Sequence, residues 1–291
     1  MAATRYQVRS ISLPSKSHPT VLRIHEELNK LRSLRSLSPC TSEVICSSLA
    51  GLEELYTCMD GFLNMESTQE AFSHCKDAAC VSELLDGSVQ LLDVCVSSRD
   101  CMMEVKERVQ DLQSLLRRRK GDSNIEKSIC SYASLRQKMK KDSKNMIAAL
   151  RRMAPKLETP AVEDQDEAYA SMIKILMDVN VATVGVFESL LSFFFSSPLL
   201  SSKTTKWSVI SRLRKKKVAA WEGGSVNEFT AADAALLSSD SSEGCWKHDT
   251  VIASDRLVAL ETSAEAIEKH LERIFRHLVA SRVSLLNTFS R

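Results

Sequence analysis

The sequence predicts an all-α protein, an elongated bundle of long antiparallel helices with coiled-coil-like seams. Two stretches, 91–116 and 257–285, carry apolar residues in alternating steps of three and four, the spacing of helices that pack side by side. The 291 residues include only eight Gly and six Pro, with 5% aromatics, which argues against a β-sandwich, a propeller or a Gly-rich nucleotide-binding fold. No run of alternating apolar and polar residues predicts a strand.

The first residues of the chain are basic and rich in Ser, with no acidic residue before Glu26. Because Pro14 and Pro19 oppose a helix there, we expect residues 1–19 to form a disordered basic arm and residues 20–291 to form the helical domain. The same composition is typical of an organelle transit peptide, and this alternative stays open.

Five helices are expected in the first half of the domain. Leu22, Leu28, Leu31 and Leu34 mark the first, which ends before Pro39. Thr41 or Ser42 can cap the second, whose buried face holds Val44, Leu49, Leu52, Leu55 and Met59. A short third helix is expected around 71–75. The fourth follows the seam Leu91, Cys95, Ser98, Met102, Val105, Val109, Leu112 and Leu116, and the fifth runs from a cap at Asp122 or Ser123 to Met153.

The composition changes at 155–167, where two Pro and five acidic residues make a candidate joint between two halves. Helices are then expected at about 166–195, at 203–221 and in an Ala-rich stretch that precedes Ser238. The last helix has the most regular pattern: Leu257, Leu260, Ala264, Ile267, Leu271, Ile274, Leu278, Ser281 and Leu285. We expect the two heptad seams to pack within the chain, with self-association as the alternative.

The cysteines and the apolar stretches indicate an intracellular protein. The nine Cys form no CxxC pair, and most fall within helical patterns. We therefore interpret most of them as small buried groups in a reducing compartment rather than as a disulfide framework or a zinc site. The apolar run 181–200 contains Glu188 and Pro198 and reads as a buried helix rather than a membrane span. We expect a cytoplasmic location, with the chloroplast or the nucleus as alternatives.

No residues suggest catalysis. The chain contains no GxGxxG, GxxxxGK[ST], HExxH or GxSxG sequence. His270 and His277 share a helix face but lack a third ligand between them, and the pair Glu53-Glu54 reads as a solvated helix face. The sequence therefore predicts a protein that is not an enzyme and that has no cofactor and no metal site.

The N-terminal arm contains a candidate phosphorylation-dependent binding site. Arg9, Ser12 and Pro14 fit the R-S-x-S-x-P pattern that 14-3-3 proteins read when the second Ser is phosphorylated. The alternative is a solvated tail in which the match arises by chance.

The segment 203–221 is a candidate contact helix, because it contains seven basic residues and no acidic one. A basic amphipathic helix with Trp anchors suits an anionic membrane surface or calmodulin, and its basic run also looks like a nuclear localisation signal. The alternative is a helix that packs its Trp on the bundle and solvates its Lys. The contact residues would be Trp207, Arg212, Arg214, Lys215, Lys216, Lys217 and Trp221.

The stretch 117–156 is also basic, with thirteen basic and three acidic residues. Nucleic acid is not expected as a partner, because no known recognition module is present and Tyr132 is the only aromatic residue there. A docking face for the acidic joint or for an acidic partner is the alternative.

Four stretches resemble a plant-specific family catalogued as domain of unknown function 241 and linked with the Bypass-like proteins. They are 6–15 (YQVRSISLPS), 91–100 (LLDVCVSSRD), Lys106-Glu107 with 112–118 (LQSLLRR), and 271–276 (LERIFR) with 282–287 (RVSLLN). The resemblance implies a helical plant protein associated with root and shoot development, without an established reaction, cofactor or substrate.

These observations predict a non-enzymatic helical adaptor or regulatory protein with protein partners, 14-3-3 proteins and calmodulin among the candidates. The alternative is a peripheral membrane-surface protein that binds anionic lipid or calmodulin through 203–221.

Sedimentation with anionic vesicles separates the two functions. If the membrane alternative is right, the protein pellets with the vesicles, and neutralising the basic residues from Arg212 to Lys217 abolishes this binding, because each cation near the surface contributes about 1 kcal/mol. Failure of the unmodified chain to pellet would contradict the membrane alternative.

Overall fold

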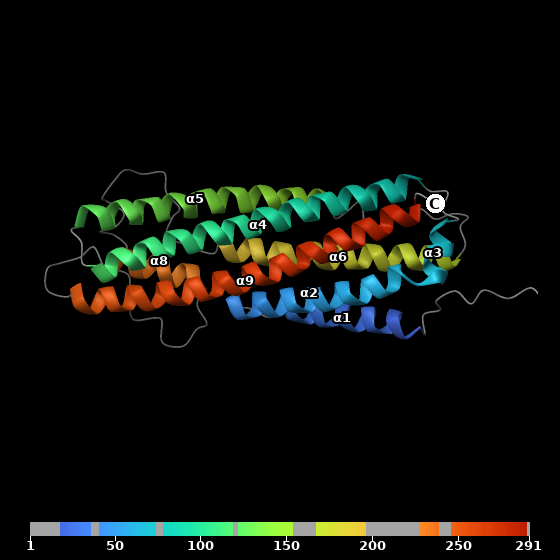
Figure 1. Ribbon diagram of the computed structural model, residues 1–291, viewed down its shortest axis with the longest axis horizontal. Coiled ribbons are helices and arrows are strands. Elements are labelled where there is room, and N and C mark those ends of the chain that lie inside the picture. The colour runs from blue at the N-terminus through green and yellow to red at the C-terminus, as the bar shows by residue number, and fades with distance from the viewer. Residues whose placement is uncertain are drawn as a thin grey trace, which may run out of the picture.

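The computed structural model describes residues 18–35, 41–73, 78–118, 122–153, 167–195, 227–238 and 246–289. Every regular element in these ranges is a helix, so the predicted all-α fold is confirmed (Figure 1). The helices are α1 (Pro19–Arg35), α2 (Ser42–Leu63), α3 (Glu66–Ser73), α4 (Ala78–Arg118), α5 (Asp122–Met153), α6 (Glu167–Phe195), α8 (Glu228–Ser238) and α9 (Trp246–Phe289).

Several sequence predictions lie outside the described residues. The N-terminal arm with Arg9, Ser12 and Pro14 is one, apart from its last residues 18 and 19, of which Pro19 begins α1, and the candidate joint, apart from its last residue Glu167, is another. The contact helix 203–221 is the third, with Trp207, Arg212, Arg214, Lys215, Lys216, Lys217 and Trp221.

The bundle is elongated, and its long helices lie side by side along the long axis (Figure 1). The longest are α4, with 41 residues, and α9, with 44. They pack against each other and run antiparallel. Two contacts show the alignment: the Cys95 thiol donates to the Leu271 carbonyl, and Arg282 donates to the Ser88 hydroxyl, so an earlier residue of α4 lies beside a later residue of α9. α2 and α8 also pack on α9, α1 packs on α2 and α6, and α5 packs on α4 and α6.

The heptad residues of α9 form one wall of the core. All nine positions predicted from Leu257 to Leu285 are buried, and the facing seam of α4 is buried from Leu91 to Leu112. Ser98, the one polar member of the α4 seam, is fully buried as well. Every described helix except α3 supplies at least three residues to one connected hydrophobic cluster, which explains why the bundle is a single packed unit.

The first helices differ in detail from the predicted ones. Thr41 caps α2 as expected, and its hydroxyl oxygen accepts a hydrogen bond from the Val44 N–H at 3.4 Å. Leu22 is 48% exposed, because the buried face of α1 is formed instead by Val21, Ile24, Leu28 and Leu31. The short third helix runs from Glu66 to Ser73, so it begins earlier than the predicted range 71–75 and overlaps it.

α6 is the most apolar helix. Its segment Tyr169–Phe195 is long and apolar enough to cross a membrane, but 67% of its most apolar window is buried inside the bundle. α1, α2, α4 and α5 all contact α6. The part of the apolar run that the structure describes, 181–195, is therefore a core helix here, as the sequence analysis expected.

Most of the described cysteines pack in or next to the core. Cys58 and Cys95 are buried, and Cys46 and Cys101 are half-buried. Burial raises the pKa of the Cys95 and Cys101 thiols to about 12, so both stay protonated at neutral pH. Cys130 is exposed on α5, and for this residue the prediction of a buried group is wrong.

Replacement of Ser98 tests the polar position in the α4 seam. The Ser98 hydroxyl has no hydrogen-bond partner, and a buried hydroxyl in this state costs about 1–3 kcal/mol. We expect Ser98→Ala to raise the free energy of unfolding, measured by urea denaturation, by about 1 kcal/mol more than Ser97→Ala does. Ser97 is exposed on the same helix, so the control carries the same gain in helix propensity. A Ser98→Ala protein no more stable than the control would contradict the prediction.

Candidate functional site

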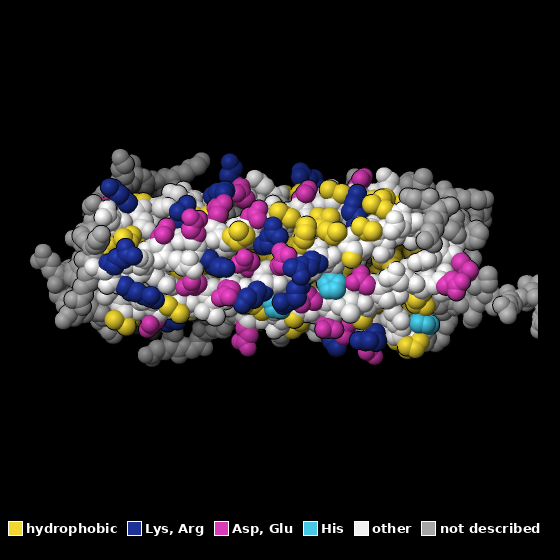
Figure 2. All heavy atoms as spheres, in the orientation of Figure 1, with side chains coloured by type: hydrophobic (Ala, Val, Ile, Leu, Met, Phe, Trp, Pro, Cys, Tyr) yellow, Lys and Arg dark blue, Asp and Glu magenta, His cyan; other side chains and the backbone are white. Residues whose placement is uncertain are grey.

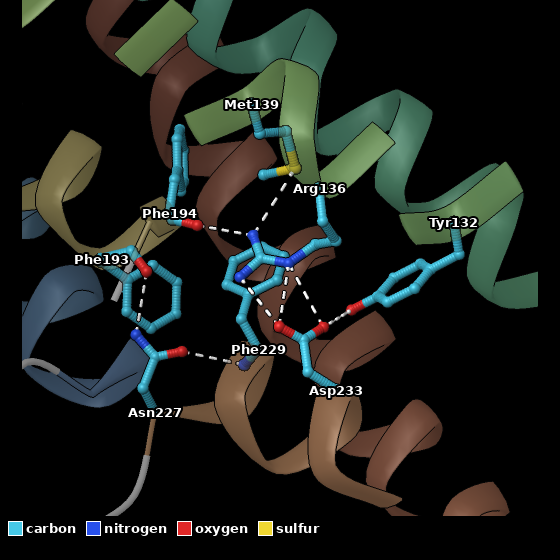
Figure 3. Close-up of polar contacts among 8 residues, drawn as sticks. All are labelled: Tyr132, Arg136, Met139, Phe193, Phe194, Asn227, Phe229 and Asp233. Carbon is cyan, nitrogen blue, oxygen red and sulfur yellow. Dashed lines mark hydrogen bonds and ion pairs between the residues drawn. The ribbon is translucent and has the colours of Figure 1, made fainter. Parts of the chain in front are cut away.

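A cluster of buried polar side chains joins α5, α6 and α8 (Figure 3). The side chains of Arg136 on α5 and Asp233 on α8 are only 2% and 3% exposed, and Arg136 Nε lies 3.3 Å from Asp233 Oδ1. The Tyr132 hydroxyl donates to the same oxygen at 2.9 Å. Arg136 Nη1 donates to the carbonyl oxygen of Phe194 at 2.5 Å, which ties the last turn of α6 into the cluster.

Aromatic rings and an asparagine complete this cluster. The Arg136 guanidinium lies over the Phe229 ring, 4.1 Å from its centroid, and Phe193 packs edge-on against the same ring. Asn227 Nδ2 donates to the Phe193 carbonyl at 2.9 Å, while its Oδ1 accepts from the Phe229 N–H and so caps the start of α8. Carbonyl groups at the end of α6 and an N–H at the start of α8 are thereby satisfied.

The cluster joins three helices through buried polar contacts. Burial and the neighbouring Asp233 carboxylate raise the pKa of Tyr132 well above its ordinary value, so the phenol stays protonated and donates to that carboxylate. Arg136, Asp233 and Tyr132 are all buried, which leaves a substrate no access to them. The physical effect of the cluster is to anchor α8 on α5 and α6.

A second set of polar contacts joins α2 to α9. Glu53 Oε1 lies 2.6 Å from His270 Nδ1, and Glu53 Oε2 accepts from Arg273 Nε at 2.7 Å. Seven residues, or about two turns, further along each helix, Asp60 Oδ2 lies 3.0 Å from His277 Nδ1. The Glu53 side chain is only 17% exposed, so its interpretation as part of a solvated face is wrong: its partners lie on a helix far away in the sequence.

The two histidines flank the α9 seam, as predicted, and each faces one carboxylate. In the described ranges no group of three or more His, Cys, Asp or Glu is arranged to hold a metal ion.

The basic stretch 117–156 is divided between several environments where the structure describes it. Arg136 is buried, and Lys138 and Arg151 pair with Glu104 and Glu188 on neighbouring helices. Lys141, Lys144 and Arg152 are exposed. Part of the charge that seemed available for a partner therefore stabilises the bundle.

The solvent side of the α4–α9 pair has two unlike halves. In one half, polar contacts join the helices: Arg99 pairs with Glu272 at 2.8 Å, Lys106 with Glu268 at 2.5 Å, and Gln113 Nε2 donates to Glu261 at 2.9 Å. In the other half, nearer the C-terminus of α9, most side chains are apolar, and Arg282 makes the polar contact between the helices by donating to the Leu85 carbonyl and to the Ser88 hydroxyl. Figure 2 shows hydrophobic side chains gathered there over α4 and α9.

We call this second half the apolar strip, defined as Val89, Leu92, Val96, Phe275, Val279, Val283 and Leu286. Val89, Val279, Val283 and Leu286 are 39%, 37%, 49% and 38% exposed, and the other three are half-buried. On α4 the members are spaced by three and four residues, as are those on α9 from Val279 onwards. Each helix therefore carries a second heptad stripe beside its buried seam.

Two adjacent helices that expose apolar stripes to solvent can receive a further helix, because a partner's side chains can fit between those of the stripes. Contiguous exposed apolar side chains also mark interaction sites on soluble proteins. The apolar strip is thus the candidate functional site in the described part of the chain. Sequence reasoning missed it, although the signal was present: Leu92 and Val96 each follow a predicted seam position by one residue, and Val89 follows the buried Ser88.

Disruption of the buried ion pair tests the anchoring role of the cluster. Arg136→Met leaves the Asp233 carboxylate buried without its cation, and we expect the free energy of unfolding to fall by about 3–5 kcal/mol. The double variant Arg136→Met/Asp233→Leu removes both charges and should recover much of this loss. Chemical denaturation measures both, with Lys138→Met as the control, since its exposed pair with Glu104 contributes about 1 kcal/mol or less. A loss for Arg136→Met no larger than that of the control would contradict the prediction.

The comparison with known families gives one match. The family described as Protein BPS1 matches residues 48–288, which run from within α2 to the end of α9. Neither the curated proteins nor the solved structures that were searched contain a match. Since the family match spans most of the chain and agrees with the resemblance to the Bypass-like proteins, the chain belongs to the BPS1 family.

Proposed function

We propose that this protein is a non-enzymatic helical adaptor or regulator of plant root and shoot development, and that the apolar strip is where it binds a helical protein surface. Membership of the BPS1 family is consistent with a developmental regulator in plants. We further propose that it acts in the cytoplasm.

The observation that carries the proposal is the exposure of the apolar strip. Four of its members each leave more than a third of their surface in water, although they lie side by side on two packed helices. Burying apolar surface stabilises a complex by about 25 cal/mol per Å². A partner helix that covers the strip would therefore gain free energy that the isolated chain does not realise.

The geometry around the strip favours recognition of a helix over a loose hydrophobic contact. The ion pairs Arg99–Glu272 and Lys106–Glu268 fix the register of α4 against α9. Because the buried seams are packed below, the strip is presented on a rigid support, which lowers the entropy lost on binding.

The membrane alternative depends on a different observation, the seven basic residues without an acidic one in 203–221. The vesicle experiment described above tests it. Phosphorylated Ser12 remains a candidate site for a 14-3-3 protein, and such binding would be compatible with an adaptor that has more than one contact point.

Complementation of plants that lack the gene tests the proposed function. We expect the double variant Val89→Lys/Val279→Lys to fail to restore root and shoot growth, because two charges in the strip would have to be desolvated in the complex. Leu22→Lys is the matched control: this Leu is 48% exposed on α1, away from the strip, and its variant should restore growth as the unmodified chain does. Circular dichroism must show that all proteins are equally helical. Full restoration by the double variant would refute the strip as the functional surface.

A further inference from the structure

The charges that border the apolar strip indicate which surface it fits. Asp86, Asp93 and Asp100 follow one another at intervals of seven on the exposed side of α4. Leu85, Leu92 and Arg99 lie on the side of α4 that is next to α9, and each Asp follows one of them by one residue, or about 100° of helix rotation. The three Asp therefore form an acidic edge along the side of the strip that is farther from α9.

The other side of the strip has a basic edge on α9. Lys269 and Arg276 are also seven residues apart, and their side chains are 64% and 72% exposed. Within the chain they pair with Glu265 and Glu272 of the same helix, and exposed pairs of this kind contribute little to stability and can be exchanged for others.

The register of the two helices places the edges at matching levels. The contacts of Arg99 with Glu272 and of Ser88 with Arg282 set the antiparallel alignment. Counted from these contacts, Asp93 is level with Arg276, and Asp100 is level with Lys269. Asp93 and Arg276 therefore stand opposite each other across the strip, and Asp100 and Lys269 stand opposite each other one heptad further on, beside the Arg99–Glu272 pair. Asp86 is level with Val283 and has no basic counterpart.

We infer that the apolar strip binds a second copy of this chain, an inference that rests on the strip being the functional surface proposed above. A two-fold axis along the strip, parallel to both helices, places α4 of one copy over α9 of the other and leaves each residue at its own level. Asp93 of each copy then faces Arg276 of the other, and Asp100 faces Lys269. The apolar side chains of the two strips meet between these edges.

The alternative two-fold axis, which runs across the strip, places α4 over α4. It would bring the acidic edges of the two copies together and the basic edges together, and like charges in direct opposition disfavour association. The charge pattern therefore selects the first arrangement, in which the two α4 helices are parallel.

Sedimentation equilibrium of the full chain tests this inference. We expect a dimer at about 100 µM, since small interfaces associate in the micromolar range or more weakly. Val89→Lys/Val279→Lys should be a monomer of unchanged helicity, while the Leu22→Lys control should remain a dimer. A chain that stays monomeric, or a dimer that the double variant does not disrupt, overturns the inference.

Charge reversal tests the arrangement itself. Asp93→Arg and Arg276→Asp should each weaken the dimer about tenfold, and the two changes together should restore it, because the pair re-forms with opposite sign. Single variants without effect, or a double variant as weak as either single one, overturn the two-fold axis along the strip.

The failure of self-association is distinguishable from the failure of the proposed function. If the unmodified chain is a monomer and Val89→Lys/Val279→Lys nevertheless fails to restore plant growth, the strip binds another protein. In that case only the inference that it binds a second copy of this chain is wrong. If the chain is a monomer and the same variant restores growth fully, both proposals are wrong.

Discussion

The antiparallel pairing of α4 and α9 is the constraint on which the rest of the structure depends. Both helices exceed forty residues, and their buried heptad seams face each other over most of that length. Since heptad packing fixes which residues are level, the pairing also determines where the polar contacts such as Arg99–Glu272 form and where the apolar strip is left uncovered. α2, α5 and α8 then pack on surfaces that this pair provides.

The Arg136–Asp233 cluster adds specificity that hydrophobic packing alone does not supply. α8 has eleven residues, too few to be stable as an isolated helix, and its apolar residues could pack in several ways. Only one position of α8 lets the ion pair form, the Tyr132 hydroxyl donate to Asp233 and Asn227 cap the helix. Any other position would leave buried charges without partners. The chemistry most typical of an active site is thus used here to hold a helix, while the exposed apolar strip carries the proposed binding.

The fold was largely predictable, and the candidate site was not. The nine predicted seam positions of the last helix are all buried, because a heptad pattern depends only on local helix geometry. Three residues departed from expectation: Leu22 and Cys130 are exposed, and Glu53 is largely covered by α9. A residue at the edge of a helix face is buried or exposed according to which helix packs beside it. The apolar strip was missed for the same reason, since its exposure depends on which surfaces of α4 and α9 the other helices cover.

The sequence by itself determined the helical class, the order of the described helices, the buried seams and the family, but it placed the starts of α4 and α9 more than ten residues too late. These features follow from local periodicity, from capping residues such as Thr41 and from stretches that match the family. Each of them can be recognised within one segment of the chain. Only the tertiary structure decided which helices are neighbours, and with that the partners of Glu53, Arg136 and Asp233 and the exposure of the strip. The physical reason is that contacts between residues about 100 to 200 positions apart depend on how helices pack, and the pattern of a single helix does not contain that information.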